Sequence, residues 1–260
     1  TFNVKPSIPS LGSLTNVEQA IDTLQISRGN PRLKTFSIYT NNLTYSLSLK
    51  KFQASLNARY LYYEKPIMER IFIENNKVIY MDENQKHYKL FNPELNVGIN
   101  ELDLFGLPGF FSANSSVGYS YFKSKGNTYE HEYNNFYVSI IGTITYKNFS
   151  FAGQYRKFQN SLFGETIQKG TDATMFMLAY HKDNFQAGVL LMYPFTNNYR
   201  TGYERVSSVA QVSSYDYVNE ASRMFVVRLS YNFEFGKKYK TNEKKLNNKD
   251  TDSGIIKLER

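Results

Sequence analysis

The chain has 260 residues, of which 41% are hydrophobic and 21% are charged, and it contains 22 Tyr and 20 Phe but neither Trp nor Cys. This composition excludes an intrinsically disordered chain, and the absence of Cys excludes a disulfide scaffold, a thiolate metal site and a cysteine nucleophile. No apolar run approaches the ~18 residues of a membrane helix, and the mean hydropathy is −0.49. A membrane β-barrel is still compatible with these values, because its strands alternate apolar and polar residues.

Positive charge exceeds negative charge by 8, and seven of the 31 Lys and Arg residues lie between positions 237 and 257. The other cations are scattered singly, whereas nucleic-acid binding calls for a basic patch. The sequence therefore predicts a basic, solvated tail over residues 236–260. It follows a domain of strands over residues 1–235, and no nucleic-acid partner is expected.

Alternation of apolar and polar residues, the period of a β-strand, recurs along most of the chain. Leu43, Tyr45 and Leu47, for example, alternate with Thr44 and Ser46. The pattern is weaker in only two of the segments that show it, residues 171–181 and 184–195. In chain order it predicts nine strands, at residues 35–48, 52–65, 88–100, 111–123, 134–146, 147–157, 171–181, 184–195 and 222–235.

The lengths of these strands and of their connections suggest a membrane protein. Most strands have 11 to 14 residues, and a tilted strand needs about 9–11 residues to cross a bilayer. Short connections alternate with long ones, as periplasmic turns alternate with outer loops in transmembrane barrels. The short connections are 49–51, 146–148 and 182–183, an intermediate one is 101–110, and the long ones are 66–87, 124–133, 158–170 and 196–221.

This alternation places the last strand, 222–235, running inward, with the tail on the periplasmic side. Within the long connection 66–87, residues 70–73 and 78–81 are predicted to form a hairpin around Asn75 and Asn76.

Aromatic residues gather at the ends of the predicted strands, as at Tyr146, Tyr193 and Phe233. Tyr has an apolar body and a polar tip, which suits the headgroup level of a bilayer. The predicted fold is therefore all-β, a transmembrane antiparallel up-and-down β-barrel of 9–10 long strands. A soluble β-fold is the alternative, because Tyr and Phe are also good strand formers.

The segment SRGNPRLK at residues 27–34, followed by NLTYS at 42–46, resembles a stretch that precedes a descending strand in TonB-dependent receptors. The closest similarity is to the outer-membrane β-barrel family of the Bacteroidota. Residues 5–11 stand where that family often has a strand ending in Arg-Pro-Ser, and residues 228–238 resemble its last strand. In this motif Gly29 and Asn30 would tolerate positive φ, and Pro31 would extend the residue before it.

The resemblance implies a barrel of about twenty-two strands behind an N-terminal plug domain. Nine strands and a stub at residues 1–5 then suggest the C-terminal part of such a barrel, without its plug and its energy-coupling motif. A ten-stranded barrel that closes on itself is the alternative. The implied location is the outer membrane of a Gram-negative bacterium. The implied partners are outer-membrane lipid, the plug domain, TonB acting through it, and an imported ligand of unknown identity.

Import of a ligand is therefore the expected function, and no cofactor is expected. The alternatives are a structural or adhesive barrel without transport and, third, an outer-membrane hydrolase. The chain is not predicted to be an enzyme, because it has no Gly-x-Ser-x-Gly element. No metal site is predicted either, since His131 alternates with Glu130 and Glu132 on an extended segment, so the three side chains cannot converge.

Two sets of residues are candidates for binding. The first set faces the interior of the predicted barrel and comprises Arg59, Gln154, Arg156, Arg228 and Glu234. The second set lies in the long connection 196–221 and is rich in Tyr and Arg, which are enriched at binding hot spots. It comprises Tyr199, Arg200, Tyr203, Arg205, Tyr215 and Tyr217.

Overall fold

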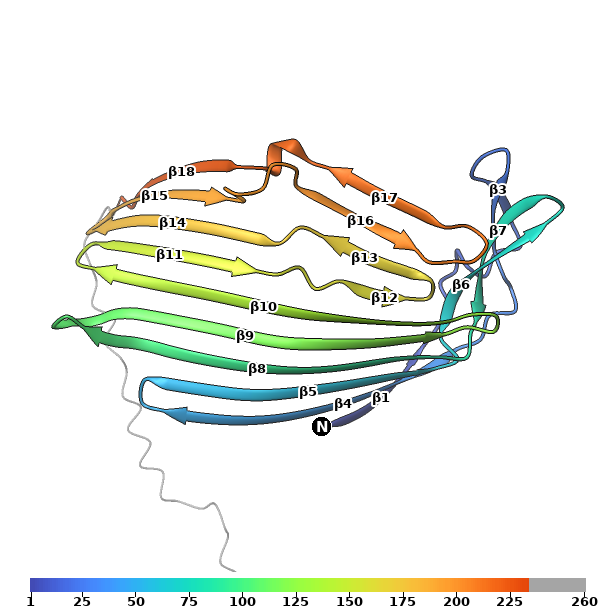
Figure 1. Cartoon of the computed structure of the whole chain (residues 1–260), viewed down its shortest axis with the longest axis horizontal. Coiled ribbons are helices and arrows are strands. Elements are labelled where there is room, and N and C mark those ends of the chain that lie inside the picture. Colours follow the sequence, from blue (N-terminus) through green and yellow to red (C-terminus); the bar gives the residue numbers. More distant parts are fainter. Residues whose placement is uncertain (234–260) are drawn as a thin grey trace, which may run out of the picture.

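The alternating segments form one ten-stranded antiparallel sheet in the computed structural model, which describes residues 1–233 (Figure 1). Each strand pairs with its neighbours in chain order, so the predicted all-β class, the nine strands and the N-terminal stub are confirmed. The strands are β1 (Phe2–Ser7), β4 (Phe36–Leu49), β5 (Phe52–Glu64), β8 (His87–Leu104), β9 (Leu107–Lys125), β10 (Glu130–Tyr146), β11 (Phe149–Arg156), β14 (Ala173–Lys182), β15 (Phe185–Met192) and β18 (Met224–Tyr231). The predicted tail, 236–260, lies outside the described residues.

Tight turns join strand pairs at one end of this sheet, on the left in Figure 1. The prediction of an intermediate connection at residues 101–110 is wrong. Strands β8 and β9 continue into it and meet at Phe105 and Gly106, with φ values of 54° and 74°. Two consecutive residues of positive φ make the kind of two-residue hairpin turn that matches the twist of the strands. All the connections at this end are therefore short.

Three of the four predicted long connections contain strands of their own, whereas the fourth, 124–133, is wrong because β9 and β10 extend into it and leave only residues 126–129. As predicted, β6 (Ile67–Glu74) and β7 (Lys77–Asn84) form a hairpin, and Asn75 and Asn76 have the positive φ values that its turn needs. They share a four-stranded sheet with β2 (Glu18–Ala20) and β3 (Gln25–Arg28). The pairing of β3 with β7 is parallel and was not predicted. Residues 8–35 lie beside this hairpin before β4 begins, and β3 runs in the same direction as β7.

Residues 158–170 and 196–221, predicted as loops, contain a further four-stranded sheet, so that prediction is wrong. Its strands are β12 (Ser161–Phe163), β13 (Thr166–Gly170), β16 (Arg200–Arg205) and β17 (Val212–Tyr217), followed by a 3₁₀ turn, η1 (Asn219–Ala221). The order β12-β13-β16-β17 repeats the order β11-β14-β15-β18, and Figure 1 shows the smaller sheet beyond the ends of those strands. Within residues 1–233, no helix is long and apolar enough to cross a membrane.

The strand register places the apolar residues of neighbouring strands on one common face of the ten-stranded sheet. One row of paired residues crosses eight of the ten strands. It runs through Phe52, Ile99, Ala113, Gly142, Gly153, Phe176, Leu191 and Phe225. The row starts at the tight-turn end of β5 and reaches the opposite end of β18, so the strands are progressively staggered in one direction. Such a stagger accompanies strands that tilt around a common axis.

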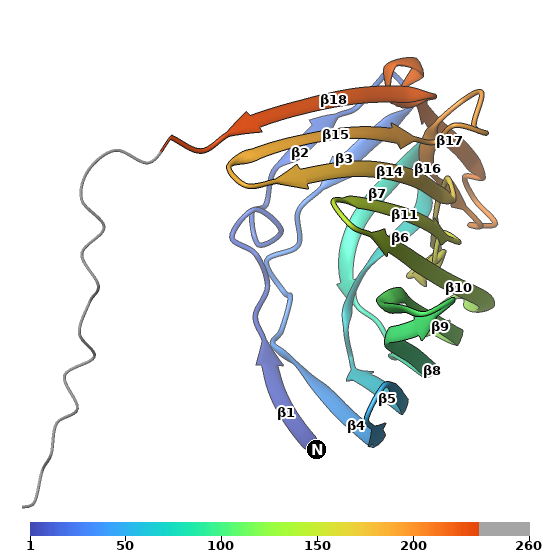
Figure 2. The ribbon, with the colours of Figure 1, turned by 90° about the vertical axis from the view of Figure 1, so that its left-hand side faces the viewer.

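The opposite face of the sheet is concave and, across β4 to β10, polar. A hollow of about 390 Å³ extends over these five strands and is lined by Ser46, Gln53, Ser55, Asn96, Asn114 and Ser116. A hollow that spans five neighbouring strands requires the sheet to curve around it, and Figure 2 shows this curvature. In the described part of the chain the sheet is open, with β1 and β18 as its edges.

The motif at residues 27–34 connects β3 to β4, and neither Gly29 nor Asn30 has a positive φ there, although both residue types tolerate it. Gly29 is needed for another reason. A Cβ atom at this position would lie 2.0 Å from the backbone oxygen of Thr15. Asn30 fixes the same turn, because its side chain donates a hydrogen bond to the Asp82 carbonyl oxygen and accepts one from the Arg32 N–H.

Replacement of Gly29 by Ala is expected to loosen this turn, because the added methyl group meets backbone that cannot rotate away. Overpacking of this kind costs about 1–3 kcal/mol. Limited proteolysis of residues 8–35 is expected to become faster in the variant. Gly142→Ala is the control, because a Cβ there has only the Phe111 ring nearby, at 3.9 Å. Equal cleavage rates in the two variants would contradict the steric role of Gly29.

Candidate functional site

The side chains with the most unusual environments lie where β6 and β7 meet the smaller sheet. Two adjoining hollows, of about 550 and 320 Å³, share Glu69 and Asp82 as lining residues. We call them together the rim hollow. The larger part is also lined by Ser13, Arg28, Tyr80 and Met81, and the smaller part by Met68, Phe163, Glu165 and Gln168.

An apolar core adjoins the rim hollow. It consists of Met68 from β6, Tyr88 from β8, Phe122 from β9, Leu162 from β12 and Ile167 from β13, all at most 8% exposed. Five strands from three parts of the chain meet here, so the rim is anchored to the ten-stranded sheet by burial of apolar surface.

Arg205 provides the main positive charge against the acidic part of the hollow. Its Nη2 lies 3.3 Å from Oε2 of Glu69, and its guanidinium carbon lies 4.8 Å from the centre of the Tyr80 ring and 5.8 Å from that of Tyr203. Its Nε is buried without a hydrogen-bond partner. A guanidinium held between two rings and one carboxylate is fixed in orientation, because both kinds of contact depend on its plane.

The pKa of Glu69 is raised above its usual value of 4.5. Burial is the largest cause, because it disfavours the charged carboxylate. Arg205 acts in the opposite direction, while repulsion from Asp82 and Glu165 adds to the rise. Asp82 in turn accepts a hydrogen bond from the Ser13 hydroxyl at 2.7 Å. The hollow therefore holds several acidic groups close to one another, and Arg205 is the cation that contacts Glu69.

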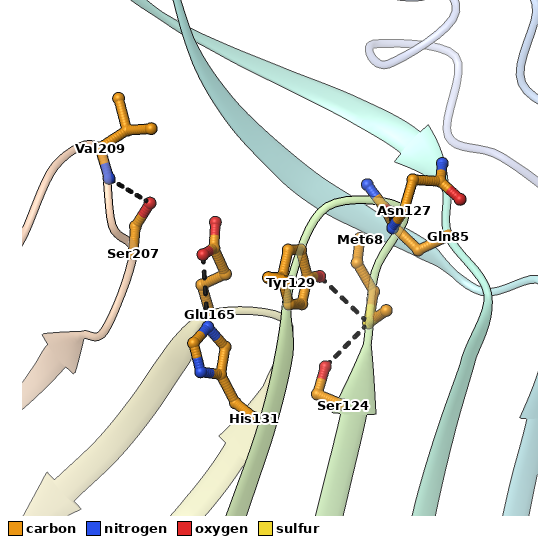
Figure 3. Close-up of polar contacts among 9 residues, drawn as sticks. All are labelled: Met68, Gln85, Ser124, Asn127, Tyr129, His131, Glu165, Ser207 and Val209. Atoms are coloured by element: carbon orange, nitrogen blue, oxygen red, sulfur yellow. Dashed lines mark hydrogen bonds and ion pairs between the residues drawn. The ribbon is translucent and has the colours of Figure 1, made fainter.

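Glu165, which lines the smaller part of the rim hollow, contacts His131 (Figure 3). Glu165 is 7% exposed, and its Oε1 lies 3.4 Å from Nε2 of His131. The Tyr129 ring stacks on the imidazole at 5.3 Å, and its hydroxyl, like that of Ser124, is directed toward the Met68 sulfur (Figure 3). Burial raises the pKa of the Tyr129 hydroxyl, so this group stays neutral and available as a hydrogen-bond donor.

Glu130 and Glu132 point away from His131, as the alternation of the sequence predicted. Both carboxylates form ion pairs with Lys123, at 2.6 Å each. Glu130 also forms an ion pair with Lys125. Among residues 1–233, no three His, Asp or Glu side chains are arranged to hold a metal ion.

Of the six residues predicted to contact a ligand, Arg205 contacts the lining residues Glu69 and Tyr80 of the rim hollow, and Tyr203 packs on Arg205. Arg200 and Tyr215 lie on the same small sheet, where the guanidinium sits 4.8 Å from the ring centre. They belong to a separate polar cluster in which the Tyr215 hydroxyl donates a hydrogen bond to Glu204. The other two lie apart. Tyr199 packs on Tyr193 with ring centres 4.8 Å apart, and Tyr217 is 57% exposed.

The residues predicted to face the interior are on one side of the sheet. The register places Arg59, Gln154, Arg156 and Arg228 on the concave face, opposite the apolar row. Glu234 lies outside the described residues. None of these four belongs to the rim hollow, so the two predicted sets are separate parts of the molecule.

Sequence reasoning missed the acidic side of the rim hollow. Glu69 and Asp82 flank the hairpin that the sequence did predict, and Glu165 lies in the turn between β12 and β13. Their contacts bridge large separations, 136 residues in the case of Arg205 and Glu69. The sequence did offer one signal for this site, because an acidic residue flanks each strand of the predicted hairpin. The alternation pattern did not single out these two residues.

Comparisons of the chain with protein-family models, with curated proteins and with solved structures found no match in any of the three. The geometry itself describes a polar hollow with carboxylates, the arginines Arg28 and Arg205, hydroxyl groups and aromatic faces. Such a set of groups can bind a polar ligand by hydrogen bonds and charge.

Loss of Arg205 is expected to raise the pKa of Glu69 further, because its attraction opposes the effect of burial. Since the folded-state pKa lies above the unfolded value, protonation of Glu69 favours the folded rim. The contribution of Glu69 to stability is therefore fully present below a pH of about 4.5 and is lost as the pH rises through the folded pKa. Arg205→Ala should extend this loss to higher pH than in the wild type.

The measurement is a titration of the Glu69 carboxyl carbon by NMR in the wild type, in Arg205→Ala and in Arg205→Lys. The Lys variant keeps the charge but loses the planar contacts with Tyr80 and Tyr203. We expect its Glu69 pKa to lie between the other two. An unchanged pKa in Arg205→Ala would show that this ion pair does not control Glu69.

Proposed function

We propose that this chain is the C-terminal part of the β-barrel of an outer-membrane receptor of the TonB-dependent type, which imports a ligand across the outer membrane. The observation that carries the proposal is the apolar face that continues along the ten-stranded sheet. Many of its side chains are substantially exposed, including Leu43, Leu56, Leu178 and Leu229 at 48–71%. Monomeric soluble proteins rarely expose apolar patches this extensive, whereas a lipid-facing surface requires one.

Aromatic residues border this face at two levels. Near the tight turns, Tyr146 pairs with Phe149, Phe149 with Tyr180, and Phe185 with Tyr231. The Phe149 and Tyr180 rings are 4.9 Å apart. Further out, the row Tyr60, Phe91 and Tyr121 crosses β5, β8 and β9. Between the two levels the residues are mostly aliphatic, such as Leu56, Leu95 and Val117. This succession supports a bilayer-spanning band with aromatic girdles.

The two open edges support a larger barrel. An edge strand presents unpaired backbone groups, and within a bilayer each of these costs several kcal/mol (~2–7) unless it is paired. In the proposed receptor, further strands pair with β1 and β18, and a plug domain lies against the polar concave face. Through this plug, TonB would supply the energy for import. The rim hollow, beyond the ends of the long strands, is then on the outer side, where a ligand first meets the receptor.

Fractionation of the cell envelope tests the membrane part of the proposal. We expect the protein in the outer membrane of a Gram-negative host, resistant to carbonate extraction and soluble only in detergent. Recovery in the soluble fraction without detergent would contradict it. The coding sequence upstream of residue 1 tests the receptor part: a plug domain and a TonB-coupling motif are expected there. A signal peptide joined directly to Thr1 would instead favour a barrel that does not transport.

A further inference from the structure

The residue composition of the concave face changes at its C-terminal strands. Over β4 to β10 it is lined by Ser, Asn and Gln, whereas over β14, β15 and β18 it carries four of the six methionines of the chain. These are Met175, Met177, Met192 and Met224. The outer face of the same strands is apolar as well, through residues such as Phe176 and Leu191. Membrane contact explains the outer face and leaves the methionines unexplained.

Three of these methionines form one row across three neighbouring strands. Met175 of β14 pairs with Met192 of β15, and Met192 pairs with Met224 of β18. Facing residues of an antiparallel pair have Cβ atoms about 4.5–5.5 Å apart. The central Met192 thus has a thioether on either side, and the unbranched side chains have enough rotatable bonds to converge. Gln154 of β11 ends the row on the other side of Met175.

The row is accessible from the concave side. Met175, Met192 and Met224 are all only partly buried. The next row, toward the tight turns, opens into a hollow of about 460 Å³ whose lining includes Met177, Leu190, Val226 and Arg228. This hollow therefore lies one row away from the three methionines, on the same face of the sheet.

We propose that Met175, Met192 and Met224 bind a soft monovalent cation of the Cu⁺ type through their three thioether sulfurs. Thioethers are soft ligands and are preferred by Cu⁺ over hard oxygen ligands. They are neutral and need no deprotonation, so binding is not opposed by proton competition, as it is for Cys and His. The chain has no Cys, so Met is its softest ligand.

The competing explanation is an apolar contact surface on the concave face. Leu would serve such a surface as well as Met, because the exchange conserves volume and hydrophobicity. Leu has no sulfur, however, and cannot bind the cation. Met-to-Leu exchanges in the row therefore distinguish the two explanations while leaving the shape of the sheet intact.

The test uses the 260-residue chain in detergent micelles, with ¹³C-labelled methionine methyl groups and Ag⁺ as the air-stable probe. We expect the methyl signals of Met175, Met192 and Met224 to shift together and to saturate at one Ag⁺ per chain. The signals of Met68 and Met81, on β6 and β7, should not move. Met192→Leu should weaken Ag⁺ binding more than about tenfold, and the matched control Met81→Leu should leave it unchanged.

Equal Ag⁺ affinity of Met192→Leu and the wild type would overturn the proposal. So would shifts of all six methyl signals in proportion to added Ag⁺, because these indicate unspecific binding to any exposed thioether. Either result leaves the membrane proposal untouched, since the fractionation experiment does not depend on the methionines.

Discussion

Leu56→Arg is expected to destabilise the membrane-inserted sheet by about 2–4 kcal/mol, the cost of a cation on the lipid face near the bilayer midplane. Leu56 is the fifth residue of β5 after the tight turn and lies on the apolar face, 49% exposed between Tyr45 and Leu95. In a soluble protein, an exposed Leu on a strand accepts Arg at little cost. The size of the effect therefore measures whether this face contacts lipid.

Ser55→Arg is the matched control. Ser55 precedes Leu56 in β5 and lines the polar hollow on the concave face, between Ser46 and Asn96. Because successive residues of a strand point to opposite faces, the two variants add the same charge on opposite sides of the sheet at the same depth. The yield of assembled protein in the outer membrane and its unfolding in denaturant should fall for Leu56→Arg only. Equal behaviour of the two variants would contradict a lipid-facing surface.

Local alternation was sufficient to predict the long strands, because the period of two and the short turns are encoded within each segment. The hairpin of β6 and β7 was predictable for the same reason, with Asn75 and Asn76 at its turn. The parallel pairing of β3 with β7 was not, because it joins residues about fifty positions apart in sequence, such as Gln25 and Val78. No local pattern reports such a contact.

The weak alternation in residues 171–181 and 184–195 has a physical cause that only the register reveals. Both faces of β14 and β15 are apolar, with Leu178 and Val189 on one side and Met177 and Leu190 on the other. A strand with two apolar faces loses its period of two.

The rim hollow was predictable only in part. Tyr203 and Arg205 stand in a conspicuous Tyr- and Arg-rich stretch, whereas Glu69 and Glu165 come from separate connections.

The rim hollow depends on how firmly the β12–β13 hairpin is held, and Leu162 is the main anchor of that hairpin. Its side chain is 1% exposed and packs with Met68, Tyr88 and Phe122. Leu162→Ala removes this buried surface and leaves a cavity, which costs about 2–5 kcal/mol. Glu165 lies three residues further, in the turn of the same hairpin, so its contact with His131 should be lost together with the packing.

Hydrogen exchange of the backbone amides measures this effect locally. In Leu162→Ala, protection should decrease in β6, β12 and β13, and much less in β14 and β15, which pair in the large sheet. Leu11→Ala is the control, because that side chain is 86% exposed and its removal leaves no cavity. If protection of β12 and β13 were unchanged, the apolar core would not be what fixes the hairpin. The position of Glu165 would then have to depend on the backbone pairing of β13 with β16 alone.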